Sequence, residues 1–277
     1  MMNLRAKAYA LRQDVMRIIM SGGAGHTGGD MSEMEILMAL YFHAMHISPE
    51  NPEDPQRDLF VLSKGHCVEA LYAVLAEKGF FEIETVIREF SRFGSQFIGH
   101  PNNKLPGIEM NSGSLGHGLP VAVGMALARK MDASPARVYV LMGDGELAEG
   151  SVWEGAMSAS HYKLDNLCAI VDRNRLQISG STEDVMHQDS VEERFTAFGW
   201  NVISLADGND IFAVMAAFDE AKTVKGKPTL VVANTLKGIG SPLMENKAAW
   251  HHHAPTQEEF EQIMADLKQH EEAAEHE

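Results

Sequence analysis

The chain has 277 residues, of which 45% are hydrophobic and 22% charged, and this composition suits a globular protein with one large α/β domain. A net charge of −16, without a cluster of Lys and Arg among aromatics, argues against a nucleic-acid-binding protein. No apolar run approaches the ~18 to 20 residues of a membrane helix, and the charged N-terminal segment is unlike a signal peptide. The surroundings of Cys67 and Cys168 are apolar, which predicts buried, reduced thiols in a cytoplasmic protein.

Apolar patterning predicts helices and strands that alternate along the chain. The predicted helices cover residues 4–20, 32–46, 67–79, 82–94, 119–131, 151–163, 210–224 and a last segment from Thr256. The predicted strands cover residues 59–63, 137–142, 166–172, 201–204 and 229–235. Because these strands read as continuous apolar runs, we predict an α/β fold with a mostly parallel sheet and helices on both faces. We expect a single domain over residues 1–277, with a tail at about 256–277 that is helical or frayed.

Two long loops interrupt this pattern. The first, at residues 21–32, is rich in glycine, and Ser32 with Glu35 three residues later resembles a capping box that would begin the next helix. The second, at residues 95–118, is rich in Gly, Asn and Pro. Loops of that length inside a compact domain are usually functional, so we expect the second loop to contribute to a site.

Polar residues follow two neighbouring strands of the predicted sheet. Asp144 lies between Gly143 and Gly145, and Asn174 follows the next strand, one strand–helix–strand unit later. A right-handed crossover places such strand ends side by side. Carboxylate and amide oxygens are ligands that Mg²⁺ or Ca²⁺ prefers, often together with phosphates, and flanking glycines let the backbone approach a diphosphate closely. We therefore predict a site for a metal ion and a diphosphate at the carboxyl edge of the sheet.

Several histidines lie in loops at the same predicted edge. His26, His66, His100 and His117 each adjoin a glycine. A neutral imidazole both donates and accepts a hydrogen bond near pH 7, which suits proton transfer to and from hydroxyls and carbonyls. A further triplet occupies residues 251–253, but adjacent residues do not all converge on one metal ion, so we do not interpret the triplet as a metal site.

The stretch "GDGELAEGSVWEGAMSASHYKLDNLCAIVDRNRLQISG" resembles the thiamine-diphosphate-binding motif, in the form found in transketolases. The segments "GHTGGDMS", "LSKGHCVEALYAVL", "GHPNNKLPGIEMNSGSLGHGLPVAVGMALA" and "LKGIG" are also similar to transketolase segments, in the same order. The resemblance covers about residues 4–255. It implies the thiamine-diphosphate-binding fold of the family's diphosphate-binding (PP) domain.

The resemblance also implies roles for individual residues. Mg²⁺, or Ca²⁺ or Mn²⁺ in its place, would be bound by the side chains of Asp144 and Asn174 and by the carbonyl of Leu176. Contacts to thiamine diphosphate are implied for His66, Gly113, Ser114, Leu115, Gly145, Asn174 and Lys237. Catalytic or substrate-contacting roles are implied for His26, His66, His100 and one residue of the triplet, either His251, which we favour, or His252. Glu149 is implied at a subunit interface, and His117 stands where many transketolases carry Gln.

A full transketolase chain is more than twice as long and also carries a pyrimidine-binding domain and a C-terminal domain. The resemblance therefore implies the N-terminal subunit of a split transketolase, completed by a separate C-terminal subunit in a heterotetramer. Its reaction would transfer a two-carbon ketol unit from a ketose to an aldose. Pentose phosphates are the family default, and the sequence leaves the sugar open.

Three alternative functions share parts of this pattern. The chain could be a subunit of another thiamine-diphosphate enzyme, either similar to 1-deoxyxylulose-phosphate synthase or of the dehydrogenase type. It could also be a homologue that binds the cofactor without catalysis. A nicotinamide-dependent oxidoreductase is disfavoured, because the glycine-rich segment at 22–29 follows a helix and "GSLGHG" lacks the dinucleotide-binding spacing.

Overall fold

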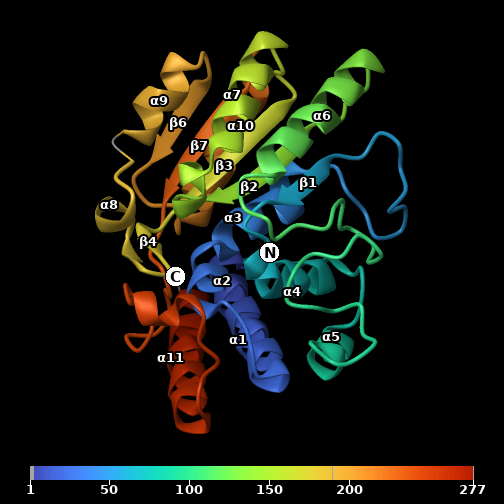
Figure 1. The fold of residues 1–277 in the computed structure, drawn as a ribbon. Coiled ribbons are helices and arrows are strands. Elements are labelled where there is room, and N and C mark those ends of the chain that lie inside the picture. The colour runs from blue at the N-terminus through green and yellow to red at the C-terminus, as the bar shows by residue number, and fades with distance from the viewer. Residues whose placement is uncertain (1–2, 189, 277) are drawn as a thin grey trace.

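A parallel sheet lies at the centre of the computed structural model, which describes residues 3–188 and 190–276 (Figure 1). Its strands are β1 (Leu59–Leu62), β2 (Val138–Gly143), β3 (Leu167–Arg173), β6 (Asn201–Leu205) and β7 (Thr229–Asn234). They are ordered β1-β2-β3-β7-β6, and each neighbouring pair is parallel. The predicted parallel sheet is therefore confirmed, and its strand bounds differ from the predicted ones by no more than one residue at either end.

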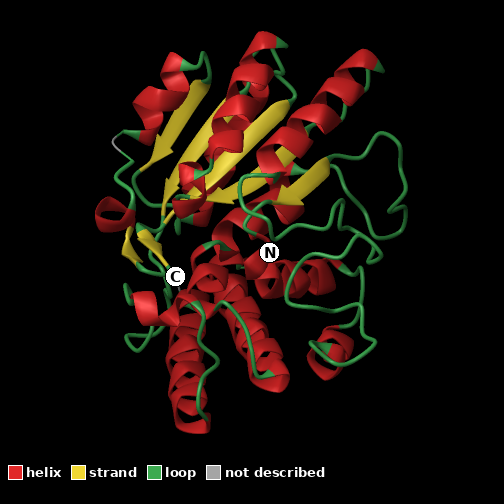
Figure 2. Ribbon diagram, in the orientation of Figure 1, coloured by secondary structure: helices red, strands yellow, loops and turns green. Residues whose placement is uncertain are grey.

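Helices cover both faces of this sheet (Figure 2). Along β2, Val138, Val140 and Met142 pack into one core, whereas Tyr139 and Leu141 pack into the other, as the alternation of a strand requires. The first core lies beneath α6 (Gly118–Met131), α7 (Gly150–His161) and α9 (Val191–Ala197). The second lies against α3 (Met34–Ala39), the π-helical turn η1 (Leu40–Ala44), α4 (Val68–Lys78) and α10 (Ile211–Thr223).

The two terminal helices lie side by side beyond the carboxyl edge of the sheet (Figure 1). They are α1 (Leu4–Gly22) and α11 (Gln257–Glu275). A capping box between Thr256 and Glu259 begins α11, whose Ile263 and Leu267 are fully buried. Of the two states expected for the tail, helical or frayed, the structure shows the helical one, and the last residue, 277, lies outside the described residues.

The remaining elements are short and surround the carboxyl edge. They are the helices α2 (Thr27–Ser32), α5 (Ile83–Glu89) and α8 (Thr182–Val185), the hairpin strands β4 (Leu176–Gln177) and β5 (Gly180–Ser181), and the 3-10 turns η2 (Gly65–Cys67), η3 (Gly145–Ala148) and η4 (Ala248–His251). Most of these turns and short helices carry or adjoin residues of the candidate site.

The predicted capping box at Ser32 is wrong. Ser32 ends α2 instead of beginning a helix, and its hydroxyl bonds to Gly29 O and Asp172. Glu35 does not cap a helix either, because it forms a buried ion pair with Arg12 of α1 at 2.6 Å. Part of the expected loop at 21–32 is helical, because α2 covers Thr27–Ser32. Tertiary partners, which the local pattern does not reveal, engage both side chains.

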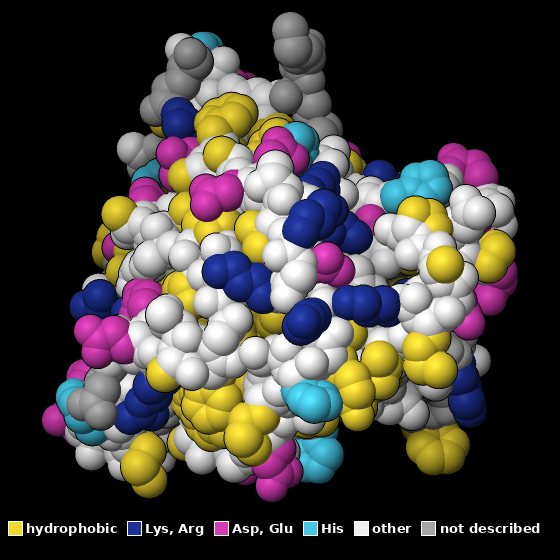
Figure 3. Space-filling view, turned by 90° about the horizontal axis from the view of Figure 1, so that it is seen from above, with side chains coloured by type: hydrophobic (Ala, Val, Ile, Leu, Met, Phe, Trp, Pro, Cys, Tyr) yellow, Lys and Arg dark blue, Asp and Glu magenta, His cyan; other side chains and the backbone are white. Residues whose placement is uncertain are grey.

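The surface is mixed in charge on the face seen from above. There, Lys and Arg side chains lie near the centre among acidic and hydrophobic ones, so the net negative charge is not concentrated on this face (Figure 3). Among the described helices, none combines the length and apolar character needed to span a membrane.

Candidate active site

The carboxyl ends of β2 and β3 bring Asp144 and Asn174 together. The register pairs Gly143 with Asp172, so the residues after each strand emerge side by side. Asp144 is buried, and its oxygens accept hydrogen bonds from the backbone N–H groups of Gly145, at 2.8 Å, and Arg175, at 2.6 Å. Burial and the nearby charge of Asp172 raise the pKa of Asp144 to about 6. A bound cation would favour the ionised form of this carboxyl group.

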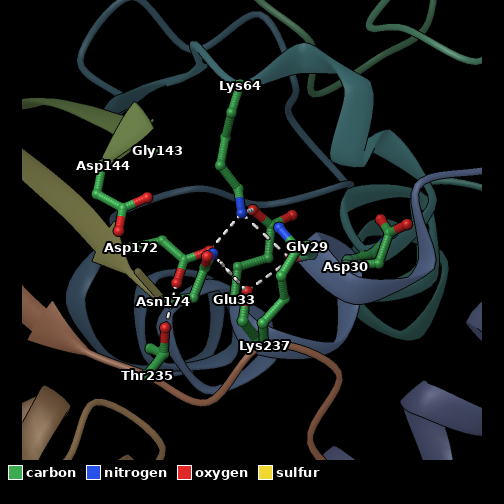
Figure 4. A network of polar contacts seen from close by, with 12 residues as sticks. Gly29, Asp30, Glu33, Lys64, Gly143, Asp144, Asp172, Asn174, Thr235 and Lys237 are labelled. Atoms are coloured by element: carbon green, nitrogen blue, oxygen red, sulfur yellow. Dashed lines mark hydrogen bonds and ion pairs between the residues drawn. The ribbon is translucent and has the colours of Figure 1, made fainter. Parts of the chain in front are cut away.

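A buried lysine contacts several groups near the ends of the strands. Lys64, just after β1, contacts Asp172 and Glu33, the latter at 3.0 Å, and donates to Gly29 O at 3.2 Å (Figure 4). Asp172 also accepts from Ser32, at 2.7 Å. Burial opposes ionisation of Asp172, but Lys64 and the surrounding donors hold its pKa below the usual range. Sequence reasoning missed this network, because Lys64, two residues before His66 in "LSKGH", gives no indication of its distant partners.

Glu146 is a second residue that the sequence analysis missed. It is buried in the 3-10 turn after Asp144 and bonds to the hydroxyl of Ser63. It also accepts from Gly116 N at 2.8 Å and from Gly143 N at 3.2 Å. One carboxylate therefore joins the ends of β1 and β2 to the long loop that precedes α6.

The predicted histidines gather above the strand ends. The ring centroid of His26 lies 4.9 Å from that of His66, 4.5 Å from that of His252 and 6.4 Å from that of His100. The rings of His66 and His251 are 5.3 Å apart. Burial lowers the pKa of His26 to about 4 and that of His251 to about 3, and it lowers the pKa of His66 and His100 as well. These four imidazoles are consequently neutral at pH 7.

A cavity of about 290 Å³ lies between the histidines and the strand ends. It is lined by most of the predicted site residues, namely His26, His66, Gly113, Leu115, Asp144, Gly145, Asn174, Leu176, Lys237 and His251. Lys64 and Glu146, which the sequence analysis did not single out, line it too. Segments that are far apart in the chain thus meet in one cavity.

Other predicted residues lie outside the lining of this cavity. His100 packs against Gly113, whose φ of 138° belongs to glycine, and a Cβ there would lie 2.6 Å from the His100 ring. His252 lies against His26, and Ser114 lies exposed on the loop. Two further predicted residues are exposed, namely His117, which precedes α6, and Glu149, which precedes α7.

Lys237 places a second cation in the cavity. Its ammonium group donates to Leu176 O at 3.3 Å and lies 3.2 Å from Nδ1 of His251. Burial lowers the pKa of Lys237. An anionic group in the cavity would therefore find a buried ammonium group beside it.

The residues present fit a metal ion bound with a diphosphate. Asp144, Asn174 and Leu176 supply a carboxylate, a side-chain amide and a backbone carbonyl, which are the hard oxygen donors of Mg²⁺ and Ca²⁺. Within the described residues, no group of three or more His, Cys, Asp or Glu is placed to hold a metal, so the amide and the carbonyl would be needed. A Cβ on Gly145 would lie 3.1 Å from Gln177, which shows how closely the backbone borders the cavity.

Comparison with known proteins gives one family. The family described as "Transketolase, thiamine diphosphate binding domain" matches residues 4–273. The chain is 48% identical to an apulose-4-phosphate transketolase subunit of Phocaeicola vulgatus, covering 93% of this chain and 91% of that one. It is 42% identical to the "6-deoxy-6-sulfo-D-fructose transketolase subunit SqwG" of Clostridium sp., covering 96% of each.

Solved structures show the same relationship. The chain resembles a transketolase mutant from Pichia stipitis with a TM-score of 0.88 and 30% identity, covering 98% of this chain and 44% of that one. It resembles transketolase from Campylobacter jejuni with a TM-score of 0.87 and 30% identity, covering 99% and 46%. The chain thus spans less than half of these solved transketolases. The strand-end residues, the histidine-lined cavity and these matches agree, and the chain belongs to the transketolase family, as its thiamine-diphosphate-binding domain.

Proposed function

We propose that this chain is the N-terminal subunit of a split transketolase that transfers a two-carbon ketol unit from a ketose or ketose phosphate to an aldose or aldose phosphate. This proposal rests mainly on the cavity in which neutral histidines face Asp144 and Asn174. Relatives of nearly the same length are themselves named as transketolase subunits, which supports a separate C-terminal subunit. A heterotetramer, with Glu149 at its interface, is the assembly we infer.

Thiamine diphosphate and Mg²⁺ are the cofactors of the proposed reaction. Asp144, Asn174 and the carbonyl of Leu176 would hold the metal ion. The diphosphate and thiazolium would be held by His66, Gly113, Ser114, Leu115, Gly145, Asn174 and Lys237. When bound, thiamine diphosphate supplies the carbanion and the electron sink that cleavage of a carbon–carbon bond requires.

The histidines of this chain would orient the sugar and move its protons. His26 and His66 are neutral at pH 7, so each can donate one hydrogen bond and accept another at the substrate's hydroxyl and carbonyl oxygens. His100, held against the loop of Gly113, would act from the cavity rim. His251 lines the cavity and His252 does not, which supports His251 as the substrate-contacting residue of the triplet.

The substrate we infer is a sugar or a sugar phosphate. Two relatives are named for apulose 4-phosphate, one for 6-deoxy-6-sulfo-D-fructose, and others are named simply transketolase. Pentose phosphates are the default acceptors and donors that we propose. The two cysteines are free and buried, which is compatible with the cytoplasmic location we infer.

A complementation assay tests the proposed split enzyme. Ketol transfer between sugar phosphates is measured with thiamine diphosphate and Mg²⁺, with and without a candidate C-terminal subunit. We expect turnover only when both subunits are present. Full turnover by this chain alone would contradict the split site, and cofactor retention without turnover by the pair would indicate a non-catalytic homologue.

Substitution of Asp144 by Ala tests the metal site. We expect the assembled enzyme to lose Mg²⁺-dependent retention of thiamine diphosphate, because the remaining amide and carbonyl oxygens carry no charge. Asp132→Ala, at an exposed residue after α6, is the matched control. Unchanged cofactor retention in the Asp144 variant would show that the metal is bound elsewhere.

A further inference from the structure

Two buried carboxyl groups lie next to the histidines but outside the network of Lys64 contacts. Asp30 belongs to α2, which begins directly after His26, and Glu69 belongs to α4, which follows the turn that carries His66. Asp30 is 0% exposed and Glu69 is 1% exposed. In Figure 4, Asp30 lies apart from the dashed contacts around Lys64.

These two carboxyl groups face each other. Asp30 Oδ1 accepts from Ala70 N at 2.9 Å, and Glu69 lies close enough to Asp30 to act on its pKa through charge and hydrogen bonding. Among the described residues, Asp30 Oδ2 and both oxygens of Glu69 have no hydrogen-bond donor, so a proton between the two carboxyl groups would satisfy them. Carboxylates are acceptors only, so a hydrogen bond between them requires a proton on one of the two. Two ionised carboxylates in contact away from water would also repel each other strongly.

Within the part of the chain that the structure describes, no further cation beside the pair could replace this proton. Lys64 is already engaged by Asp172 and Glu33. The titratable and charged groups that face the pair are Lys64 after β1, Glu33 after α2, Cys67 before α4 and Tyr72 within α4, while Arg12 of α1 is held by Glu35. Burial, reinforced by the charges of Glu69 and Glu33, raises the pKa of both carboxyl groups.

The pair also connects the backbones of two histidines. The carbonyl of His26 accepts from Gly29 N, at 3.0 Å, and Asp30 N, at 3.3 Å. Gly25, which precedes His26, packs so closely that a Cβ there would lie 3.0 Å from Glu69 Oε1. Asp30 thus lies on the segment of His26, and its partners Ala70 and Glu69 lie on the segment of His66.

We propose that Asp30 and Glu69 share one proton and, as a hydrogen-bonded acid pair, are positioning residues that hold His26 beside His66. The pair locks the start of α2 onto the start of α4, and this contact sets the 4.9 Å separation of the two imidazole rings. The role in catalysis rests on the proposed transketolase function, whereas the shared proton does not.

The shared proton is tested by the pH dependence of stability. Because the pKa of the pair is raised on folding, the folded chain binds a proton that the unfolded chain releases, and stability is lost as pH rises from about 4 toward the folded pKa. We expect Asp30→Asn, which keeps the acceptor for Ala70 N and donates an N–H to Glu69, to reduce that proton uptake by about one. Asp132→Asn at the end of α6 is the control. If the Asp30→Asn variant takes up as many protons on folding as the unmodified chain, the proposal of a shared proton is overturned.

The positioning role is tested in the assembled enzyme with both subunits. Asp30→Ala removes the contact to Ala70 N and Glu69, and we expect kcat to fall by up to about 100-fold through misplacement of the histidines. Asp30→Asn should restore most of that loss, and imidazole NMR signals of His26 and His66 should shift in the Ala variant and return in the Asn variant. Equal kcat in the two variants, or unshifted signals in the Ala variant, would contradict the positioning role. The NMR and stability measurements need no sugar turnover, so they separate this proposal from the proposed function.

Discussion

Lys64 has almost no access to water, and the groups that contact its ammonium lie at the end of β3 and on α2 and the residue after it. Its side chain is 2% exposed, and Asp172 and Glu33 are fully buried. A buried ion pair gains stability only where further hydrogen bonds satisfy the remaining atoms. Here Ser32 and Thr235 also donate to Asp172, so the oxygens of Asp172 are satisfied, whereas Glu33 has only its ion pair with Lys64.

Substitution of Lys64 by Met therefore leaves two buried carboxylates without their cation. We expect the free energy of unfolding to fall by about 3–5 kcal/mol. Urea unfolding of the chain measures the change, and Lys104→Met, at an exposed position, is the control. A loss within the ~0.5 kcal/mol usual for surface substitutions would show that the ion pair is not part of the folded protein's stability.

The cavity histidines make stability depend on pH on the acid side. Burial lowers the pKa of His26 to about 4, against about 6.5 when unfolded. Between these values the unfolded chain binds more protons, so the stability present above pH 6.5 is lost as pH falls toward 4. We expect His26→Gln to show a shallower loss than the unmodified chain, by up to about 1.4 kcal/mol per pH unit.

Thermal unfolding between pH 7.5 and 4.5 measures the effect of the His26 substitution. His117→Gln is the matched control, because this histidine is exposed before α6. Identical slopes for His26→Gln and the unmodified chain would contradict a buried, neutral His26.

At the scale of elements, the strands could be predicted well and several helix boundaries could not. The central strands β2 and β3 are apolar on both faces, so a run of buried residues in sequence is itself the signal. The helix expected over 82–94 ends at Glu89, and Ser91 takes a φ of 56°. The helix expected from Ser32 begins at Met34, because Ser32 ends the separate helix α2. In both cases contacts with distant segments override the local pattern.

Helix α6 contains two glycines in very different surroundings. A Cβ on Gly118 would overlap the side chain of Ser63 and lie 2.8 Å from its Cα, whereas a Cβ on Gly124 meets nothing within 4 Å. We expect Gly118→Ala to cost about 1–3 kcal/mol by forcing α6 away from the end of β1. We expect Gly124→Ala to stabilise the chain by about 0.5–1 kcal/mol, since alanine is the better helix former.

Urea unfolding of the two variants and the unmodified chain tests this contrast. The two substitutions add the same methyl group to one helix, although Gly118 is its first residue and Gly124 lies in its interior, where alanine gains more. Equal effects would show that α6 does not dock closely on Ser63.

At the scale of the whole molecule, part of the site was predictable from topology alone. Asp144 and Asn174 follow neighbouring strands, so their approach depends only on the order of the sheet. The contact of Lys64 with Glu33 and Asp172 joins three distant segments, and no spacing in the sequence indicates it. Counting residues left His251 and His252 as alternatives, and only the folded cavity distinguishes their positions.

The two terminal helices pack against each other and connect to the segment of the site. Leu267 of α11 is fully buried, and a Cβ on Gly240 would lie 2.6 Å from its Cδ2. Helix α11 packs on α1, whose Arg12 binds Met31 O at 2.9 Å and Glu35. The last helix is thereby connected to the segment that follows His26.

We expect Leu267→Ala to lower the free energy of unfolding by about 2–5 kcal/mol, through lost apolar contacts and the cavity left behind. Lys268→Ala, at the exposed neighbour, is the control. Circular dichroism reports on all helices, whereas fluorescence of the three tryptophans, which lie in or against the two cores, reports on packing around the sheet. If α1 and α11 unfold with the sheet, both probes shift to the same lower urea concentration. Separate transitions would instead show that the terminal helices unfold as an independent unit. The inferred connection from α11 through α1 to the segment that follows His26 would then be contradicted.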